Sequence, residues 1–387
     1  MRDNGRVAVS YWDDGVRMTR SIVGLALVSI ALNACGDQSP DYASLPLCRA
    51  DSLSASQYVT WIRKANGAVW TIGDAYTLEE LKQFEMLARN QALHPNQIIN
   101  LPNLPPAYIP RRQAWFPADA VAWETRGWTL CEISPSQQLT CGTYGDTVAT
   151  LDSVTEVAEA AYTEPFMESG NYTPIYALKS DGSVWDVINS TPDAQAPAVG
   201  TTGITALSVT ESPATRCGVD ADGAVWCWGS GFLGDGEASH ATEQAPFPVP
   251  LSAKAATVAA GYHMTCAVLV DGGVWCWGRQ YNADDWTSPT QVNVDGVATL
   301  AMTSSGGACA LKKDGTVWCW GESAWSTRHE PEQVVAIGSD AVEVVASITH
   351  ACARKSDRTI WCWGSSARGS AGPDDYGSVP NAIRGCE

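Results

Sequence analysis

The pattern that decides the fold is the stretch "CALKKDGTVWCWG", residues 309–321. It sets two cysteines ten residues apart around an Asp-Gly pair, and it ends with a second tryptophan and a glycine. Asp-Gly favours a tight turn, and the β-branched and aromatic residues beside it favour strands. Gly315 suits the end of that turn, because only a residue without Cβ takes the left-handed conformation at low cost. The stretch therefore predicts a β-hairpin.

The register of this hairpin indicates what its cysteines do. With Asp314 at the centre of the loop, Leu311 pairs with Val317. Two residues further out, Cys309 pairs with Cys319 as a non-hydrogen-bonded pair, whose Cα atoms lie about 4.5 Å apart and within disulfide range. A zinc site favours cysteines two to four residues apart, and a redox centre favours Cys-x-x-Cys. We therefore expect a disulfide, with free buried thiols and a metal site as the alternatives.

The same pattern recurs along the chain. Four copies align without gaps and start at Cys217, Cys266, Cys309 and Cys352. Weaker copies, which lack the cysteines or the Asp-Gly, start at Trp61, Cys131 and Tyr176. The intervals between starts are 70, 45, 41, 49, 43 and 43 residues, and four-stranded propeller blades have about this length. The sequence therefore predicts an all-β, seven-bladed β-propeller over residues 47–387.

Two copies break the turn rule, since Gln137 and Arg358 stand where the others have glycine. We expect these turns to be strained or differently shaped. The long first interval holds an insertion at about residues 77–118. Its segment 77–93 has a capping box and apolar residues at helical spacing, and a proline-rich segment follows. One short helical insertion is therefore expected in the first blade.

The thirteen cysteines can all be assigned. Five hairpins use ten of them, as Cys131–Cys141, Cys217–Cys227, Cys266–Cys276, Cys309–Cys319 and Cys352–Cys362. Cys48 and Cys386 remain at the two ends of the folded part. Because a propeller is expected to close its ring by joining the chain ends in one blade, a Cys48–Cys386 disulfide would act as a clasp. Disulfides form in oxidising compartments, so the protein is expected outside the cytoplasm.

The N-terminal region also indicates export. Arg20 precedes the apolar run "SIVGLALVSIALNAC", residues 21–35, which has the length of a signal-peptide core and is too short for a membrane-spanning helix. Its end resembles a bacterial lipobox, although Asn33 replaces the usual small residue. We expect a signal peptide over residues 1–35 (with Met18 as a second candidate start), lipidation of Cys35, and a tether over residues 36–46. An ordinary secreted protein and a cytosolic one are the alternatives.

A formal net charge of −18 excludes two classes of partner. Nucleic acid and anionic membrane surfaces both require a basic stripe, which this chain lacks. The spread of the acidic residues favours simple solubility, with a cationic partner as the alternative. We expect a monomer that contacts a membrane only through its lipid anchor, in the bacterial cell envelope at the outer membrane, cell surface or periplasm.

Two segments resemble the repeats of the regulator of chromosome condensation family: "GYHMTCAVLVDGGVWCWG" (261–278) and "WCWGSGFLGDGE" (226–237). The matching residues are Gly261, His263, Asp271, Gly272, Trp275, Trp277, Gly278, Leu233, Gly234 and Gly236. The resemblance covers about residues 205–387, and the Leu-Gly-x-Gly loop is missing from blades five and six. It implies a seven-bladed propeller that acts as a binding platform, with His263 and His350 in a structural position. The family's founder acts on a small GTPase and chromatin, which an acidic exported chain is not expected to meet.

Tryptophan is abundant, with 17 residues. Those in the hairpin motif are expected to pack between blades, with sugar stacking as the alternative. Five of those outside the motif are candidate contact residues: Trp115, Trp123, Trp128, Trp286 and Trp325.

No nucleophile with a recognisable base, His-Glu-x-x-His or phosphate loop is present. "DADG", residues 220–223, is similar to a calcium loop, but a turn also explains it. We therefore expect no catalytic residue, cofactor or metal. The favoured function is a lipid-anchored platform that holds an unknown protein or glycan through its inter-strand loops. The alternative is an envelope hydrolase or lyase with a site in the central channel.

Overall fold

The structure is a computed structural model, and it describes sixteen segments of the chain: residues 45–56, 59–73, 111–113, 122–126, 129–143, 146–159, 175–187, 191–192, 203–209, 215–261, 264–279, 285–303, 307–323, 326–347, 349–364 and 377–386. Strands and turns make up these segments, with one 3-10 turn, η3, at Val335–Ile337. None of the described residues forms a helix long and apolar enough to cross a membrane. The signal peptide, Cys35 and the helix expected at 77–93 lie outside the described residues.

The described strands form seven antiparallel four-stranded sheets, and each sheet uses four consecutive strands of the chain. We number these blades 1 to 7 in chain order. Blades 1 to 3 contain β1 (Ser52–Ser56), β2 (Val59–Arg63), β3 (Val69–Gly73) and β4 (Arg111–Gln113); β5 (Ala122–Arg126), β6 (Thr129–Ile133), β7 (Leu139–Thr143) and β8 (Asp146–Leu151); β9 (Val154–Glu159), β10 (Ile175–Lys179), β11 (Val184–Asp186) and β12 (Thr191–Pro192).

Blades 4 to 7 have the same four-stranded arrangement. They contain β13 (Ile204–Val209), β14 (Thr215–Asp220), β15 (Val225–Gly231) and β16 (His240–Pro248); β17 (Ala255–Ala260), β18 (Met264–Leu269), β19 (Val274–Gly278) and β20 (Trp286–Val292); β21 (Val297–Met302), β22 (Ala308–Lys312), β23 (Val317–Ser323) and β24 (Ser326–Gln333); β25 (Ala341–Ala346), β26 (His350–Lys355), β27 (Ile360–Gly364) and β28 (Gly377–Ala382).

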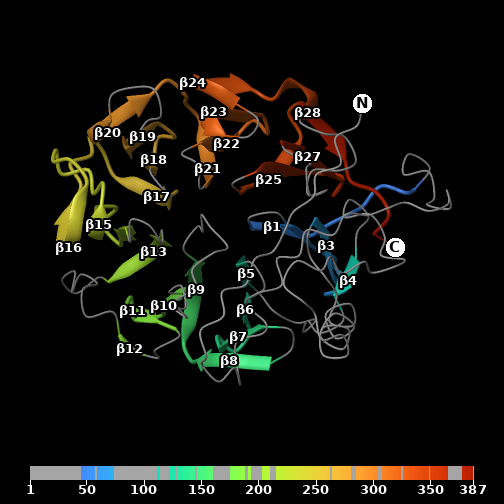
Figure 1. Cartoon of the computed structure of the whole chain (residues 1–387), viewed down its shortest axis with the longest axis horizontal. Coiled ribbons are helices and arrows are strands. Elements are labelled where there is room, and N and C mark those ends of the chain that lie inside the picture. The colour runs from blue at the N-terminus through green and yellow to red at the C-terminus, as the bar shows by residue number, and fades with distance from the viewer. Residues whose placement is uncertain are drawn as a thin grey trace, which may run out of the picture.

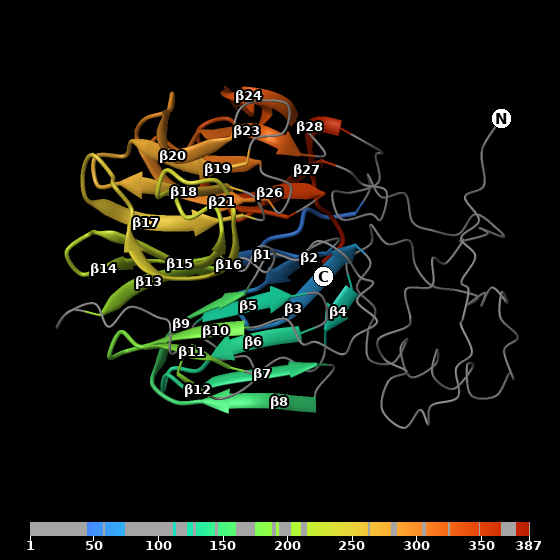
Figure 2. The ribbon, with the colours of Figure 1, turned by 60° about the vertical axis from the view of Figure 1, so that its left-hand side comes forward.

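The blades close into a ring (Figure 1). The first strand of each blade contacts the first strand of the next, in the order β1, β5, β9, β13, β17, β21, β25 and back to β1. The outer strands lie on the rim (Figures 1 and 2). The predicted seven-bladed propeller is therefore confirmed.

The hairpin register is the one that the sequence predicts. Leu311 pairs with Val317, and Cys309 pairs with Cys319. The copies without cysteines keep the register, since Trp61 pairs with Thr71 in blade 1. Because a shift by one residue would turn every side chain to the opposite face, the shared register gives all blades the same two faces.

Six disulfides join the twelve cysteines of the described residues, in the pairs that the register and the clasp argument predict. The five hairpin bridges have Cα–Cα distances of 4.0 to 4.2 Å. Cys48–Cys386 has a Cα–Cα distance of 5.1 Å and a sequence separation of 338 residues. Disulfides are rare in the reducing cytoplasm, so these bridges indicate an extracytoplasmic protein.

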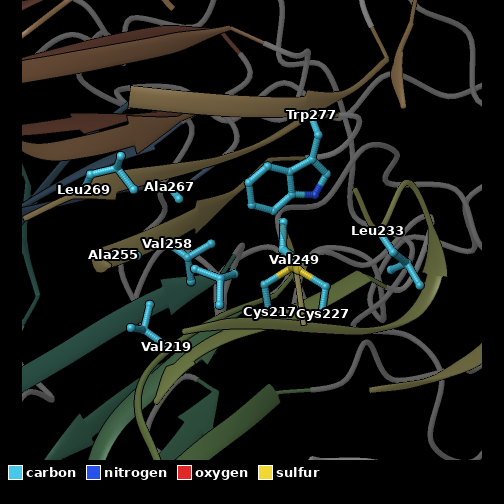
Figure 3. Close-up of a cluster of buried hydrophobic side chains, with 11 residues drawn as sticks. Cys217, Val219, Cys227, Leu233, Val249, Ala255, Val258, Ala267, Leu269 and Trp277 are labelled. Atoms are coloured by element: carbon cyan, nitrogen blue, oxygen red, sulfur yellow. A yellow bond between two sulfur atoms is a disulfide. The ribbon is translucent and has the colours of Figure 1, made fainter. Parts of the chain in front are cut away.

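Each bridge also forms part of the packing between blades. Trp277 of blade 5 is fully buried and points toward the Cys217–Cys227 disulfide of blade 4, in a cluster that includes Leu233 and Val249 (Figure 3). The second tryptophans of blades 6 and 7, Trp320 and Trp363, lie in the equivalent clusters with the preceding bridges. The second tryptophan is therefore a core residue at the blade junction.

A backbone hydrogen bond repeats at the junctions. The carbonyl of the last turn residue in one blade accepts the N–H that starts the next blade, as from Ala255 N to Gly223 O at 2.8 Å. The same bond reaches the carbonyls of Gln137 and Arg358, whose φ angles are 62° and 73°. These two turns are therefore strained rather than differently shaped, because the next blade requires the carbonyl in that place.

The ring closes differently from the expectation. No described blade combines strands from both chain ends, since blade 1 starts at β1 and blade 7 ends at β28. Two isolated bridges join the ends instead, between Leu47 and Arg384 and between Arg49 and Thr359, beside the Cys48–Cys386 disulfide. Leu45 and Pro46, placed in the tether by the sequence, accept hydrogen bonds from Arg384 and Gly385.

Candidate binding surface

The propeller has two faces, set by the direction of the strands. The turns between second and third strands lie on one of them, which we call the turn face: Asn66–Gly67, Ser136–Gln137, Asp181–Gly182, Asp222–Gly223, Asp271–Gly272, Asp314–Gly315 and Asp357–Arg358. The connections from first to second and from third to fourth strands belong to the opposite face, because neighbouring strands are antiparallel. Most of those connections lie outside the described residues.

Aspartates of the turn face are used to build their own turns. Asp314 Oδ1 accepts the N–H of Thr316 at 3.0 Å and its hydroxyl at 2.6 Å. These hydrogen bonds lower the pKa of Asp314, and equivalent bonds from Ser183 lower the pKa of Asp181. The Thr316 hydroxyl also accepts the indole N–H of Trp318. The aspartate, the threonine hydroxyl and the first tryptophan therefore form one hydrogen-bonded unit that shapes the turn.

The "DADG" segment, residues 220–223, forms the same kind of hydrogen-bonded turn, which accounts for its aspartates without a calcium ion. Asp220 is buried, and its Oδ1 accepts the N–H groups of Asp222 and Ala224, both at 2.9 Å. Its Oδ2 accepts the indole N–H of Trp226 at 3.0 Å. Within the described ranges, no group of three His, Cys, Asp or Glu residues could hold a metal ion.

The loop after β15 is the longest fully described connection of the face opposite the turns. Leu233 is fully buried at the junction with blade 5. A Cβ on Gly234 would lie 3.0 Å from Cδ1 of Trp277, and Gly236 donates its N–H to Thr287 O at 3.0 Å. Glycine is required here because the backbone lies directly on the next blade. Asp235 and His240 close the loop with a 2.7 Å contact between Oδ2 and Nε2.

The first strands around the channel carry two equivalent carboxylates. Glu156 accepts the N–H of Leu207 from the next blade at 3.2 Å, and Glu343 accepts the N–H of Leu53 at 3.0 Å. Glu343 also forms an ion pair with Arg354 at 2.6 Å. Both carboxylates thus bridge neighbouring blades.

His350 is the most perturbed titratable group of the described residues. It is fully buried, and burial lowers its pKa to about 3, so the ring is neutral at pH 7. Its Nδ1 lies 2.8 Å from the Ser347 hydroxyl, and its Nε2 lies 2.7 Å from the Thr60 hydroxyl of blade 1. Because the imidazole is buried, a substrate cannot reach it. Its contacts with the hydroxyls of Ser347 and Thr60 join blades 7 and 1.

The sequence likeness to known proteins is local. Residues 255–283 match the Regulator of chromosome condensation (RCC1) repeat. The match starts with β17 of blade 5 and includes the whole hairpin of β18 and β19. No curated protein matches the chain.

Solved structures resemble the fold at low sequence identity. Prp20p from Saccharomyces cerevisiae shares 16% identity over 86% of this chain and 76% of that chain, with a TM-score of 0.46. Human WBSCR16 shares 15% over 88% and 83%, with a TM-score of 0.45. PorZ, a surface component of the type-IX secretion system of Porphyromonas gingivalis, shares 11% over 88% of this chain but only 38% of that chain, with a TM-score of 0.47. These likenesses concern the fold alone.

Outside the matched RCC1 repeat, blade 3 departs from the pattern at both cysteine positions. Tyr176 stands where the first cysteine would be and pairs with Asp186. Arg216 of blade 4 is buried, donates to the Tyr176 hydroxyl at 2.7 Å and forms an ion pair with Glu243. This polar network replaces a disulfide at the junction. The sequence prediction missed it, although a charged Arg216 at a position that is Thr, Ala or Ala in the next three RCC1-type hairpins was a usable signal.

The candidate contact tryptophans are described only in part. Trp286 is half-buried, starts β20 and packs against the cluster between blades 5 and 6, so it is partly a core residue. Trp123 lies in β5, of which the structure describes the backbone. Trp115, Trp128 and Trp325 lie outside the described residues, and their contact role stays a prediction.

Proposed function

We propose that the protein is a lipid-anchored binding platform of the bacterial envelope, which holds a protein or glycan through the connections opposite the turn face. One observation carries this proposal: Glu156, Glu343 and His350 make contacts between neighbouring blades, and the aspartates of the turn face, as at Asp314, accept hydrogen bonds of their own turns. The connections are the part of the blade that this architecture leaves free to vary.

The enzyme alternative has less support. A hydrolase or lyase needs an acid or base that can reach its substrate. Glu156 and Glu343 bind backbone N–H groups of neighbouring blades, and His350 is buried and neutral.

The binding role is tested by capture from envelope fractions. We expect the lipidated protein to retain the same partner in repeated captures, and the double variant Trp128→Ala/Trp325→Ala to lose it. Trp275→Ala, a half-buried tryptophan of a hairpin, is the matched control and should retain the partner. Turnover of envelope glycans without any reproducible partner would contradict the proposal and favour the enzyme.

The anchor is tested separately. Mass spectrometry of the membrane-extracted protein should find an acyl-modified Cys35 at the new N-terminus, and Cys35→Ser should be released into the soluble fraction. An unmodified Cys35 in a soluble wild-type protein would indicate an ordinary secreted protein.

A further inference from the structure

The hairpin turn of blade 1 has an asparagine where blades 3 to 7 have an aspartate. The residues at this position are Asn66 in blade 1 and Asp181, Asp222, Asp271, Asp314 and Asp357 in blades 3 to 7. Asn66 is followed by a glycine, Gly67, whereas the other two asparagines of the described segments are followed by a valine and an alanine. Blade 1 therefore has an amide in place of a carboxylate, beside a residue without Cβ.

The Asn66 side chain makes the same hydrogen bond as an aspartate of the repeat. Its Oδ1 accepts the N–H of Ala68 at 3.1 Å, as Asp314 Oδ1 accepts the N–H of Thr316 at 3.0 Å. This bond to the backbone two residues further on folds the side chain back over the peptide bond that follows it. Cγ of Asn66, the carbonyl carbon of the amide, is therefore held on the side of the Gly67 nitrogen.

A backbone hydrogen bond covers the Gly67 nitrogen while the turn is closed. The Gly67 N–H donates to Lys64 O at 2.9 Å, and Gly67 has a φ angle of 75°. Asn66 is exposed at the tip of this turn, so solvent reaches its amide. Surface turns open locally at low cost, and opening of this turn frees the Gly67 nitrogen. Glycine has no side chain that would shield the nitrogen once it is free.

We propose that Asn66 is a modification site, which deamidates without an enzyme. The Gly67 nitrogen gives its proton to hydroxide and attacks Cγ of Asn66. A bond forms between this nitrogen and Cγ, and the bond from Cγ to Nδ2 breaks, so that Nδ2 leaves as ammonia with a proton from water. The product is a five-membered imide that includes the main-chain carbonyl of Asn66.

Water then opens the imide at one of its two carbonyl carbons. Addition at Cγ breaks the new bond to the Gly67 nitrogen and gives aspartate. Addition at the main-chain carbonyl breaks the original peptide bond instead and gives isoaspartate, in which the chain continues through Cγ. Oxidation and reduction are not involved, and water is the one co-reactant besides hydroxide.

The aspartate product fits blade 1, because the neighbours of an aspartate in this repeat are already present. Lys64 stands two residues before the turn asparagine, and its Nζ lies 5.3 Å from the ring centroid of Trp70. In blade 6, Lys312 stands two residues before Asp314, and its Nζ lies 5.4 Å from the ring centroid of Trp318. A new carboxylate in blade 1 would thus have a lysine beside it, as Asp314 has.

The isoaspartate product does not fit the turn. It adds one carbon atom to the main chain directly before Gly67, whose N–H donates to Lys64 O at 2.9 Å. On the other side of the turn, the Lys64 N–H donates to Ala68 O at 2.9 Å. A longer chain between these two bonds cannot keep both at their present length. We therefore expect molecules with isoaspartate to be less stable than molecules with aspartate.

The test is incubation of the full chain at pH 8 and 37 °C, followed by digestion and mass spectrometry that distinguishes asparagine, aspartate and isoaspartate. We expect Asn66 to lose its amide at least tenfold faster than Asn293, which is also exposed but is followed by a valine. An unchanged Asn66 would overturn the proposal. Equal rates at the two residues would overturn it as well, because exposure alone would then decide the reaction.

Two variants test the chemistry and the fit of the product. Asn66→Gln keeps an amide but would need a six-membered ring, so it should stay unmodified under the same conditions. Asn66→Asp should unfold in urea at or above the midpoint of the wild type, since it restores the aspartate of the repeat. A lower midpoint would contradict the fit. The site lies on the turn face, so these results do not depend on the binding role of the opposite connections.

Discussion

At the last position of the hairpin turn, two residues have the left-handed backbone conformation that the other five blades reserve for glycine. Gln137 and Arg358 have positive φ angles, and each carbonyl accepts the N–H that starts the next blade. An L-residue in this region costs about 1–2 kcal/mol. The hydrogen bond between blades therefore holds the turn in its shape against the preference of the side chain. Arg358 also forms an ion pair with Asp51 of blade 1 at 2.5 Å.

Relief of this strain at Gln137 is testable, because its side chain is exposed. Gln137→Gly should raise the free energy of unfolding by about 0.5–1 kcal/mol, the strain relieved less the extra chain entropy of glycine. Gly315→Ala is the opposite control, since the new Cβ would lie 2.3 Å from Ser339 O. It should lower the free energy of unfolding by about 2–4 kcal/mol. Urea unfolding measures both, and a loss of stability in Gln137→Gly would contradict the strain argument.

His350 makes stability depend on pH in a defined direction. Its pKa is about 3 in the folded protein, against about 6.5 when unfolded. Between these values the unfolded chain binds one more proton, so the stabilisation present above pH 6.5 is lost as pH falls, at about 1.4 kcal/mol per pH unit. His350→Gln should lower stability at pH 7 and remove this slope. Urea unfolding at pH 7, 6, 5 and 4 compares the two proteins; parallel curves would rule out His350 as the source.

At the scale of the element, the hairpin disulfide of one blade is also part of the hydrophobic core between that blade and the next. A disulfide lies on one face of a blade, and the second tryptophan of the next blade covers it, as Trp277 covers Cys217–Cys227 (Figure 3). The first tryptophan of the motif is half-buried. In blade 6 this is Trp318, and Nζ of Lys312 lies 5.4 Å from its ring centroid. The two tryptophans of a motif thus have different roles, one in the core and one at the surface.

Substitutions of Trp277 test whether its contribution to stability comes from the volume of its side chain or from its indole N–H. The indole N–H of Trp277 is buried and has no hydrogen-bond partner among the described residues. Trp277→Ala should therefore cost about 3–5 kcal/mol through the cavity alone, and Trp277→Phe only about 1–2 kcal/mol. Trp275→Ala, on the half-buried neighbour, should cost less than Trp277→Ala. Equal losses in Phe and Ala variants, measured by urea unfolding, would show that the N–H is needed.

At the scale of the whole molecule, the ring is held closed by contacts between blades 7 and 1. The chain ends share no sheet, so the closure depends on the Cys48–Cys386 disulfide, two isolated bridges and the bond between His350 and Thr60. Glu343 adds its hydrogen bond to Leu53. These contacts link residues nearly 300 or more positions apart, and their loss would open the ring.

Removal of the clasp should therefore cost more than removal of a hairpin bridge. The closed loops span 338 and 10 residues, for which chain entropy gives about 6 and about 3 kcal/mol. We compare Cys48→Ser/Cys386→Ser with Cys266→Ser/Cys276→Ser by urea unfolding. Hydrogen exchange should also show faster opening of β1 and β25 in the clasp variant. Unchanged protection of these strands would mean that the other contacts alone hold the ring.

The sequence predicts the strand pairing of the hairpins better than it predicts the residues of a binding surface. The pairing of Cys309 with Cys319 follows from counting outward from one Asp-Gly turn, and so does the pairing of Tyr176 with Asp186 in a copy without cysteines. The candidate contacts were less predictable. Trp286 was expected at the surface and packs partly in a core, because its burial depends on the neighbouring blade.

The sequence by itself determined the hairpins, their disulfides and the number of blades, because these depend on residues about ten positions apart and on a period that repeats along the chain. The tertiary structure decided how the ring closes, why Gln137 and Arg358 keep the glycine conformation, and that Arg216 replaces a missing bridge. These features depend on which blade lies against which and on the direction of each N–H group, and only the folded chain brings those groups together.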